Sequence, residues 1–295
     1  MKILDGKSLA LARRWALADW VEQHVQQAGR PPGLTVLLAG DDPASATYVR
    51  SKEKASAKAG IQGEVQRLSH SITQNELLAR IEALNADPNV DGILVQLPLP
   101  KGLDENLVLD AIHPSKDVDG FHPVNSGALW QQRGEVAPCT PLGIMHLLEA
   151  YNVELSGKSA LIIGRSNIVG RPMAELLLQQ HATVTIAHSR TRDLKSLIAT
   201  SDIVVAAIGR PEFVKAEWLK PGAVCIDVGI NRTPHGLVGD IATNIVKAFV
   251  IFTIFSALSN SVRPIFAALS TSSWLTASMQ MWLERASKFI VWVIG

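Results

Sequence analysis

Apolar runs of strand length alternate with helix-like patterns from the N-terminus to about Asp240. Such alternation is typical of parallel sheets covered by helices. We therefore predict an α/β protein with two sheets. The first is expected to hold strands at Leu34–Ala39, Gly63–Leu68 and Val90–Leu97, and the second at Ser159–Ile163, Thr183–Ala187, Ile203–Ala207 and Ala223–Val228.

Helices in the first series are marked by capping residues. Asp42 precedes Pro43, which pairs an N-cap with proline at the first helical position, and Gly60 is expected to close that helix. Thr73 and Glu76 have the spacing of a capping box and predict the start of a second helix.

The strand predicted at Ser159–Ile163 runs into a glycine turn and then into a helical pattern. Gly164, Ser166 and Gly170 form a weak variant of the dinucleotide-binding fingerprint. The N-terminus of the next helix is expected to present unpaired N–H groups to a phosphate. Glycine turns also arise from packing alone, so the spacing leaves both interpretations open.

The residues that follow the strand predicted at Thr183–Ala187 indicate which cofactor, NAD or NADP, the site would bind. An NAD site has an acidic residue near the end of this strand, whereas here His188–Thr191 follow and the first carboxylate is Asp193. Arg165 and Arg190 suit a 2′-phosphate instead. We therefore prefer NADP, although either arginine alone is more often a solvated loop charge.

Composition restricts the class of protein. The chain has 295 residues, 47% of them hydrophobic, which is enough for two domains, and Asp117–Pro141 is interpreted as the crossing between them. A net charge of +1 argues against nucleic acid or an anionic membrane as partner. Cys139 and Cys225 lack metal-ligand spacing, so we expect no metal site and reduced thiols in a cytoplasmic protein. The N-terminus has no apolar signal core.

Tyr48 and Lys52 lie four residues apart on the predicted helix Pro43–Ala59 and therefore share a face. A lysine that transfers protons at neutral pH must have its charged form disfavoured by burial or by nearby positive groups. Because three further basic residues lie on this helix, the spacing alone favours a solvated lysine.

Gln96 lies near the end of the strand predicted at Val90–Leu97, at the edge where ligands collect in open parallel sheets. Its amide can accept a hydrogen bond from a lysine and donate one to a substrate, or it is an ordinary polar strand end. Further on, Asp117 and Asp119 place two carboxylates on one loop. One of them could receive paired N–H donors from a heterocycle, and the alternative is an Asx turn closed by Gly120.

These segments occur in an order that resembles the bifunctional methylenetetrahydrofolate dehydrogenase/cyclohydrolase family. They are Ala44–Lys52, Gly92–Pro100, Lys116–Gly120, Pro138–Pro141, Gly164–Ser166 and Ile226–Asn231. The resemblance covers residues 1 to about 240. It implies an N-terminal three-layer α/β catalytic domain at 1–138, a Rossmann-like NADP-binding domain with a parallel sheet at 139–240, and a cleft between them.

The resemblance also implies a function in one-carbon metabolism and purine biosynthesis. A homodimer would oxidise 5,10-methylenetetrahydrofolate to the methenyl form with NADP and then hydrolyse that product to 10-formyltetrahydrofolate. By the family's pattern Lys52 is the acid/base group, Tyr48 positions the folate, and Gln96 orients and tunes Lys52. Leu97 and Pro98 would contact the substrate, and Asp119 would bind the pterin. The residues implied for the cofactor are Gly164, Arg165, Ser166, Ser189, Arg190 and Ile230.

After Asp240 the pattern departs from the family, whose glycine-rich folate loop is not recognisable here. Only 5 of the last 55 residues are charged, and we expect an atypical apolar tail at 241–295 with a helix near 279–294 that returns to the first domain. A terminal change of reading frame would produce this composition. A membrane tail is less convincing, because Ala248–Val262 is shorter than the roughly 20 residues needed to span a bilayer, and Pro264–Leu283 contains seven Ser, Thr and Gln residues.

Two alternatives to the bifunctional enzyme remain open. One is an inactive or impaired relative that retains NADP binding or dimerisation. The other is a different two-domain NADP dehydrogenase acting on a small acid, for which Tyr48, Lys52 and Gln96 have no evident use.

Overall fold

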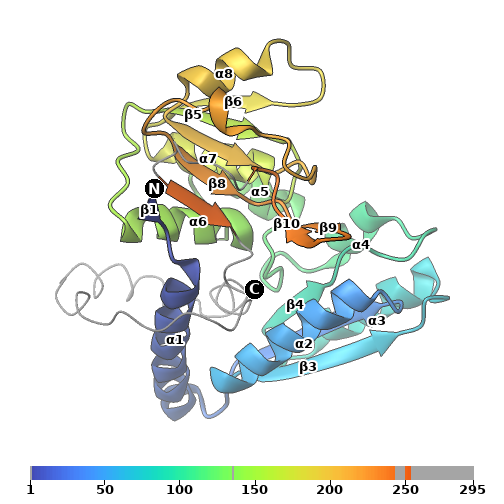
Figure 1. The fold of residues 1–295 in the computed structure, drawn as a ribbon. Coiled ribbons are helices and arrows are strands. Elements are labelled where there is room, and N and C mark those ends of the chain that lie inside the picture. The colour runs from blue at the N-terminus through green and yellow to red at the C-terminus, as the bar shows by residue number, and fades with distance from the viewer. Residues whose placement is uncertain (1, 135, 243–249, 254–295) are drawn as a thin grey trace. The chain divides into compact units, whose positions relative to one another are not determined.

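The computed structural model describes residues 2–134, 136–242 and 250–253. They divide into two compact units (Figure 1). One is formed by Leu11–Cys139, and the other by the described residues among the first ten together with those between Thr140 and Thr253. Each unit contains a parallel sheet, so the predicted α/β class is confirmed.

The unit of Leu11–Cys139 is built on three parallel strands in the order β3-β2-β4. Its elements are α1 (Gly6–Ala28), β2 (Gly33–Ala39), α2 (Pro43–Lys58), β3 (Gln62–Leu68), α3 (Gln74–Ala86), β4 (Gly92–Val95), α4 (Glu105–Ala111) and α5 (Pro123–Trp130). The predicted strands agree within one residue for β2 and β3. β4 is shorter than the predicted Val90–Leu97, although the N–H groups of Asp91 and Gln96 on either side of it still donate to the Gly33 and Leu37 carbonyls of β2.

Helices cover both faces of this sheet and make the predicted three layers. On one face, Val36 and Leu38 of β2 pack with apolar residues of α1 and α2. On the other face, Leu37 and Ile93 pack with α3 and α4. Every residue of β2 is buried. A strand buried on both faces has to be apolar nearly throughout, which explains the continuous apolar run in the sequence.

The predicted helix starts are confirmed. The Asp42 carboxylate accepts the Ser45 N–H at 2.7 Å at the start of α2. At the start of α3, Thr73 and Glu76 form the reciprocal capping box. Beyond α2, Gly60 has a φ of +75°, a backbone conformation that favours glycine.

A helix, α5, lies inside the segment interpreted as the crossing between domains, where none was predicted. It begins with Pro123, and the N-cap is His122, whose Nδ1 accepts the Val124 N–H at 3.1 Å. Histidine is not among the residues that usually mark an N-cap, so the start was hidden in the sequence.

The second unit contains a six-stranded sheet in the order β1-β11-β8-β7-β5-β6, parallel throughout. Its strands are β1 (Lys2–Ile3), β5 (Ser159–Ile163), β6 (Thr183–Ala187), β7 (Ile203–Ala206), β8 (Val224–Asp227) and β11 (Val250–Thr253), and a separate antiparallel hairpin is formed by β9 (Asn231–Thr233) and β10 (Gly236–Val238). Its helices are α6 (Cys139–Ala150), α7 (Gly170–Gln179), α8 (Leu194–Thr200) and the short η1 (Ala216–Trp218).

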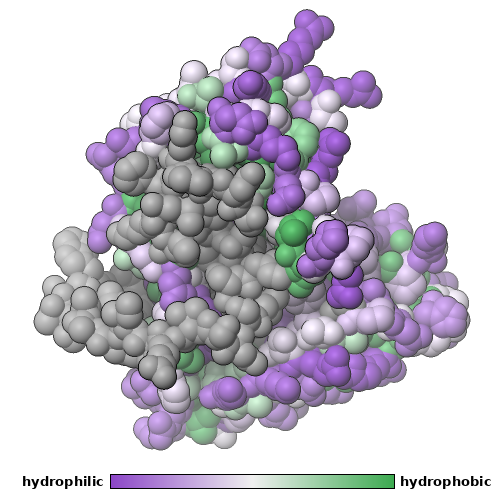
Figure 2. Space-filling view, in the orientation of Figure 1, coloured by the Kyte–Doolittle hydropathy of each residue, from purple (hydrophilic) through white to green (hydrophobic). Residues whose placement is uncertain are grey.

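The four predicted strands of this sheet are all present, but β1 and β11 were not predicted. β11 lies in the expected apolar tail, where it pairs with β8 on one side and β1 on the other. The helix predicted near 279–294 lies outside the described residues. No helix among the described residues is long and apolar enough to cross a membrane. Figure 2 shows hydrophilic side chains over most of the coloured part of the face in view.

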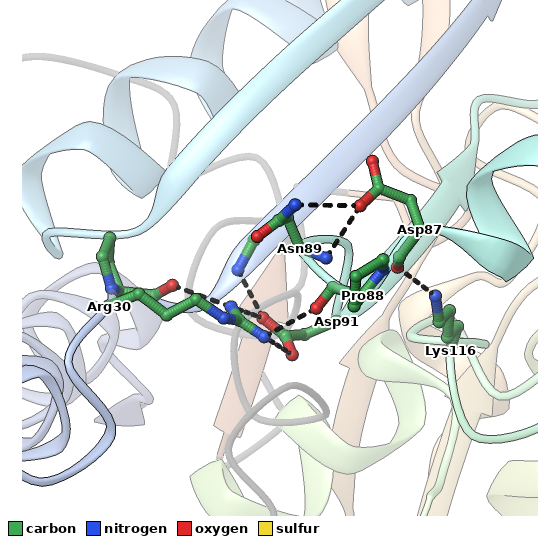
Figure 3. A network of polar contacts seen from close by, with 8 residues as sticks. Arg30, Asp87, Pro88, Asn89, Asp91 and Lys116 are labelled. Atoms are coloured by element: carbon green, nitrogen blue, oxygen red, sulfur yellow. Dashed lines mark hydrogen bonds and ion pairs between the residues drawn. The ribbon is translucent and has the colours of Figure 1, made fainter.

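A polar network fixes the amino end of the three-stranded sheet (Figure 3). Arg30 donates to both carboxylate oxygens of Asp91, at 2.6 and 2.8 Å, and to the Pro88 carbonyl at 3.0 Å. Asp91 also accepts the Gly33 N–H at 2.7 Å. Lys116 donates to two carbonyls at the C-terminus of α3, including that of Asp87. These contacts lie before β2 and β4 begin, and therefore leave the carboxyl ends of the strands free for a site.

Candidate active site

The three-stranded sheet has a topological switch point between β2 and β4. The chain passes from the central strand β2 to β3 on one side and then to β4 on the other. Ligands of open parallel sheets bind beyond the carboxyl ends of the strands at such a point. Gln96 lies there, because its N–H continues the ladder to the Leu37 carbonyl at 2.9 Å.

Lys52 reaches this strand end from α2. Its Nζ donates to Gln96 Oε1 at 3.4 Å, and its side chain is partly buried whereas those of Arg50, Lys54 and Lys58 are exposed. Its burial and its hydrogen bond therefore distinguish Lys52 from the other basic residues of the helix, which the sequence spacing alone could not do.

The amide of Gln96 is held in one orientation. Its Nε2 donates to the Leu97 carbonyl at 2.7 Å, which leaves Oε1 directed at Lys52. We expected the NH₂ group to be available to a substrate, but one of its two hydrogens is already used within the chain. Leu97 is partly buried and Pro98 is exposed beside it. Tyr48 lies one helical turn before Lys52 and is partly buried, and desolvation raises the pKa of its hydroxyl.

The two carboxylates of the following loop have different surroundings. Ile93 donates its N–H to the Lys116 carbonyl at 2.8 Å, which brings this loop alongside β4. Asp117 is buried and accepts the N–H groups of Gly120, Phe121 and His122 at 3.0, 3.3 and 2.9 Å, and a fourth bond from the Asn125 side chain. Asp117 therefore closes the loop, as the Asx-turn alternative expected.

Asp119 has no such partners. Among the described residues, none donates a hydrogen bond to its carboxylate. Desolvation raises the pKa of Asp119 to about 6, with the charge of Lys52 opposing this rise and that of Asp117 adding to it. An acidic group that is desolvated, unsatisfied and close to a lysine is a candidate for ligand binding.

Cys139 belongs to the same surroundings, which the sequence did not indicate. Burial raises the pKa of its thiol well above the usual value, Asp119 adds to this rise and Lys52 opposes it. Its Sγ lies 3.7 Å from the Val118 carbonyl oxygen. The only signal for this position was its place in the segment Pro138–Pro141.

The six-stranded sheet has its own switch point, between β5 and β7. The order β6-β5-β7-β8 places four strand ends side by side at one edge. Gly164 follows β5 with a φ of +127°, and a Cβ there would lie 2.3 Å from the Ala207 carbonyl oxygen beyond β7. Only glycine permits this approach, so the predicted turn is required by packing at the place where a nucleotide would bind.

The expectation for the helix N-terminus is wrong in detail. The first N–H groups of α7 are not free, because Ser166 Oγ accepts those of Val169 and Gly170 at 3.2 and 3.3 Å, and the Ser166 carbonyl accepts that of Arg171 at 3.0 Å. Pro172 has no N–H. Within this turn, the N–H groups of the exposed residues 165–168 are instead the ones that have no partner among the described residues.

The residues that follow β6 favour a phosphate over a ribose hydroxyl. The first carboxylate after β6, that of Asp193, is the N-cap of α8, where it accepts the Ser196 N–H at 3.4 Å. Ser189 and Arg190 are exposed, and the Arg190 N–H is held by His188 Nδ1 at 3.1 Å. With the exposed Arg165 next to Gly164, the donor set fits an anionic nucleotide. Ile230, which follows β8, is 37% exposed.

Two family models match the chain. The catalytic domain of tetrahydrofolate dehydrogenase/cyclohydrolase matches residues 4–119, and the NAD(P)-binding domain of the same enzyme matches residues 138–268. The second match extends past Asp240, so the relation reaches further along the chain than the sequence motifs indicated.

Individual proteins agree with these models. The Bifunctional protein FolD of Enterococcus faecalis is 48% identical over 287 residues, which cover 97% of this chain and 98% of that protein. The crystal structure of the Campylobacter jejuni bifunctional FolD methylenetetrahydrofolate dehydrogenase/cyclohydrolase has a TM-score of 0.85 and 41% identity, and covers 99% of each chain. The Trypanosoma brucei enzyme, solved with NADP cofactor and inhibitor, has a TM-score of 0.83 and 32% identity over 99% of this chain and 97% of its own.

Proposed function

The chain belongs to the tetrahydrofolate dehydrogenase/cyclohydrolase family, and we propose that it oxidises 5,10-methylenetetrahydrofolate with NADP and hydrolyses the methenyl product to 10-formyltetrahydrofolate. The observation that carries this proposal is the hydrogen bond from Lys52 Nζ to Gln96 Oε1 at a switch point, with the unsatisfied Asp119 nearby. The relatives are named for the bifunctional enzyme and give no support to the alternative of an inactive relative.

On this proposal Lys52 is the acid/base group. Water adds to the electrophilic carbon of the methenyl product, a proton must then leave that water, and a nitrogen must accept one as the ring opens. An amine held by Gln96 is suited to this exchange. The bond to Oε1 fixes the position of the amine and uses only one of its hydrogens, so the others remain available for proton transfer. Tyr48 lines the same helix face and positions the folate.

Substrate binding is assigned to the groups around this lysine. The Asp119 carboxylate receives two N–H donors of the pterin, which would take the place of the partners that none of the described residues provides. Gln96, Leu97 and Pro98 contact the substrate beside it. These roles are supported by exposure at the strand end and by the pKa of Asp119, about 6, which indicates a carboxylate that is costly to keep unpaired.

Cofactor binding is assigned to the edge of the six-stranded sheet. When bound, NADP supplies the hydride acceptor of the first reaction. Gly164 and the N–H groups of Arg165 and Ser166 receive its phosphates, and Ser189 and Arg190, with Arg165, hold the 2′-phosphate. Ile230 provides an exposed apolar contact. We accordingly assign the folate role to the three-stranded unit, which lies within the predicted 1–138 apart from Cys139, and the NADP role to the six-stranded unit, which adds β1 and β11 to the predicted 139–240.

The metabolic role, the cellular location and the oligomeric state are also part of the proposal. The one-carbon product would serve purine biosynthesis in the cytoplasm, and neither a membrane nor a nucleic acid is required. We propose a homodimer, supported by β6, an edge strand of the six-stranded sheet that carries the 38% exposed Ile186. Light scattering of the purified protein tests the dimer.

The activity is tested with a matched pair of lysine variants. Lys52→Met is expected to abolish cyclohydrolase turnover, measured as loss of the methenyl absorbance, with an unchanged far-UV circular dichroism spectrum. Lys54→Met, on the same helix but exposed, should retain turnover within about twofold, because an exposed side chain remote from the site contributes little to the transition state. Full hydrolysis by the first variant, or no NADPH formation from methylenetetrahydrofolate by the unaltered protein, would contradict the proposal.

A further inference from the structure

Two fully buried carboxylates lie at the carboxyl end of the six-stranded sheet, and the proposed reaction does not use them. Asp227 is the last residue of β8, and Asp240 lies in the segment that follows the β9–β10 hairpin. Both are 0% exposed. A buried charge is expensive unless it is fully hydrogen-bonded, so the partners of these two groups indicate why they are there.

Asp240 binds the loop that follows β7. Its Oδ2 accepts the N–H groups of Ile208 and Gly209 at 2.7 and 3.0 Å. Its Oδ1 accepts the Arg210 N–H at 2.8 Å and the Asn231 side-chain amide at 2.9 Å. One carboxylate therefore holds three successive residues of one loop and ties them to the start of β9.

Asp227 binds the chain around Asp240 in turn. Its Oδ1 accepts the N–H groups of Gly229 and Asp240 at 3.0 and 2.8 Å, and its Oδ2 accepts that of Ile241 at 3.0 Å. We refer to Asp227 and Asp240 together as the carboxylate brace. Its seven hydrogen bonds connect the ends of β7 and β8 to one another.

The glycines beside the brace leave room for it. A Cβ at Gly229 would lie 2.2 Å from Asp240 Oδ1, and one at Gly239 would lie 1.8 Å from Asp227 Oδ2. Both distances are far below van der Waals contact. The backbone therefore passes against the carboxylates as closely as the chain allows, which fixes the course of residues 228–231.

We propose that Asp227 and Asp240 are positioning residues of the cofactor site, which hold loops 207–210 and 228–231 in the shape that receives the nucleotide. This inference rests on the proposed function. Loop 207–210 begins with Ala207, whose carbonyl lies against Gly164, and loop 228–231 contains the exposed Ile230. Two like charges placed side by side are a poor means of packing a core, and their retention is explained if these loops must be held to a narrow geometry.

Asp240→Asn tests the inference, because an amide puts an NH₂ group where one oxygen faced N–H donors. Three quantities are measured on the full chain: the Kd for NADP by calorimetry, amide hydrogen exchange in 207–210 and 228–231, and cyclohydrolase turnover, which uses no cofactor. We expect faster exchange in both loops and a Kd raised about tenfold, since hydrogen bonds to charged groups are lost. Cyclohydrolase turnover should stay within about twofold, because its residues lie in the other unit.

Asp202→Asn is the matched control. Asp202 precedes β7, at the opposite end of the same sheet, and accepts hydrogen bonds from Ser159 and Lys220. Its replacement should lower stability without changing the Kd for NADP. The inference would be overturned by an unchanged Kd and unchanged exchange in Asp240→Asn, by a loss of cyclohydrolase turnover as large as the loss of NADP affinity, or by an equal rise in Kd in Asp202→Asn.

Asn231→Ala is the milder second variant in case Asp240→Asn does not fold. It removes one of the four partners of Asp240, so we expect faster exchange in 228–231 and a Kd raised by about threefold; no change in either would also overturn the inference. If the unaltered protein does not bind NADP, the proposed function fails. If the unaltered protein binds NADP but amide exchange in both loops is unchanged in the variants, only the proposed role of the carboxylate brace is rejected.

Discussion

Asp119→Asn is expected to stabilise the protein above pH 6 while weakening folate binding. Desolvation raises the pKa of Asp119 from 3.8 to about 6 in the folded state. The folded chain therefore holds a proton that the unfolded chain has already released between these two pH values. It follows that the free energy of unfolding falls as the pH rises from about 4 to 6, and the full penalty is present above pH 6.

The size of the effect follows from the same shift. A difference of about two units corresponds to a penalty of at most about 3 kcal/mol at pH 8, of which about half remains at pH 5. Asparagine does not ionise, so the variant should exceed the unaltered protein in stability by these amounts. Urea denaturation at the two pH values, followed by circular dichroism, measures both differences.

Asp117→Asn provides a control of opposite sign. Asp117 accepts four N–H groups, and loss of charge-assisted bonds there should lower stability by at least about 2 kcal/mol. If Asp119→Asn were no more stable than the unaltered protein, or if its advantage were equal at pH 5 and pH 8, the argument from desolvation would be refuted. A parallel assay should give a raised KM for methylenetetrahydrofolate in Asp119→Asn, because the pterin donors lose a charged acceptor.

Two further predictions concern other parts of the chain. Arg190→Gln should raise the KM for NADP by roughly tenfold to a hundredfold, the loss expected for a charged hydrogen bond, and should leave the KM for NAD nearly unchanged. Arg192→Gln is the control. Equal effects in both variants, or on both nucleotides, would count against a 2′-phosphate role for Arg190. Arg30→Ala should lower the free energy of unfolding by about 1 kcal/mol, a modest value because the Arg30–Asp91 pair is partly exposed. Turnover at saturating substrate should not change in Arg30→Ala, and slower turnover would show that the network in Figure 3 affects the site.

Local sequence signals predicted the elements that carry the site. β5 and β6 begin and end at the predicted residues; β5 lies between Lys158 and Gly164, and β6 ends before His188. The caps of α2 and α3 were predicted because each depends on residues three positions apart. The rule that ligands gather at strand ends singled out Gln96, whereas its contact with Lys52 was implied by the family resemblance.

Pairings between distant residues, and local hydrogen bonds that no residue preference marks, could not be predicted. β1 has only two residues, too few for a local pattern, and the apolar run that contains β11 does not indicate that it pairs with β1 and β8. The start of α5 at His122 depends on a ring nitrogen that happens to face the Val124 N–H. The sequence of the glycine turn gave no indication that Ser166 would take the first donors of α7 for itself.

The acidic residues show most clearly where sequence interpretation ends. Asp117, Asp193 and Asp240 lie in loops near the candidate sites, as Asp119 does, and their sequence contexts do not distinguish them. The structure does, because the first three accept N–H groups of the chain, whereas none of the described residues donates to Asp119. A carboxylate satisfied by its own loop has little capacity left for a ligand, while an unsatisfied one keeps the stability penalty of its desolvation until a ligand donates to it. The number of donors that each carboxylate already has therefore separates the residues that shape a site from the one that is available to bind, and this is why Asp119→Asn and Asp117→Asn are expected to change stability in opposite directions.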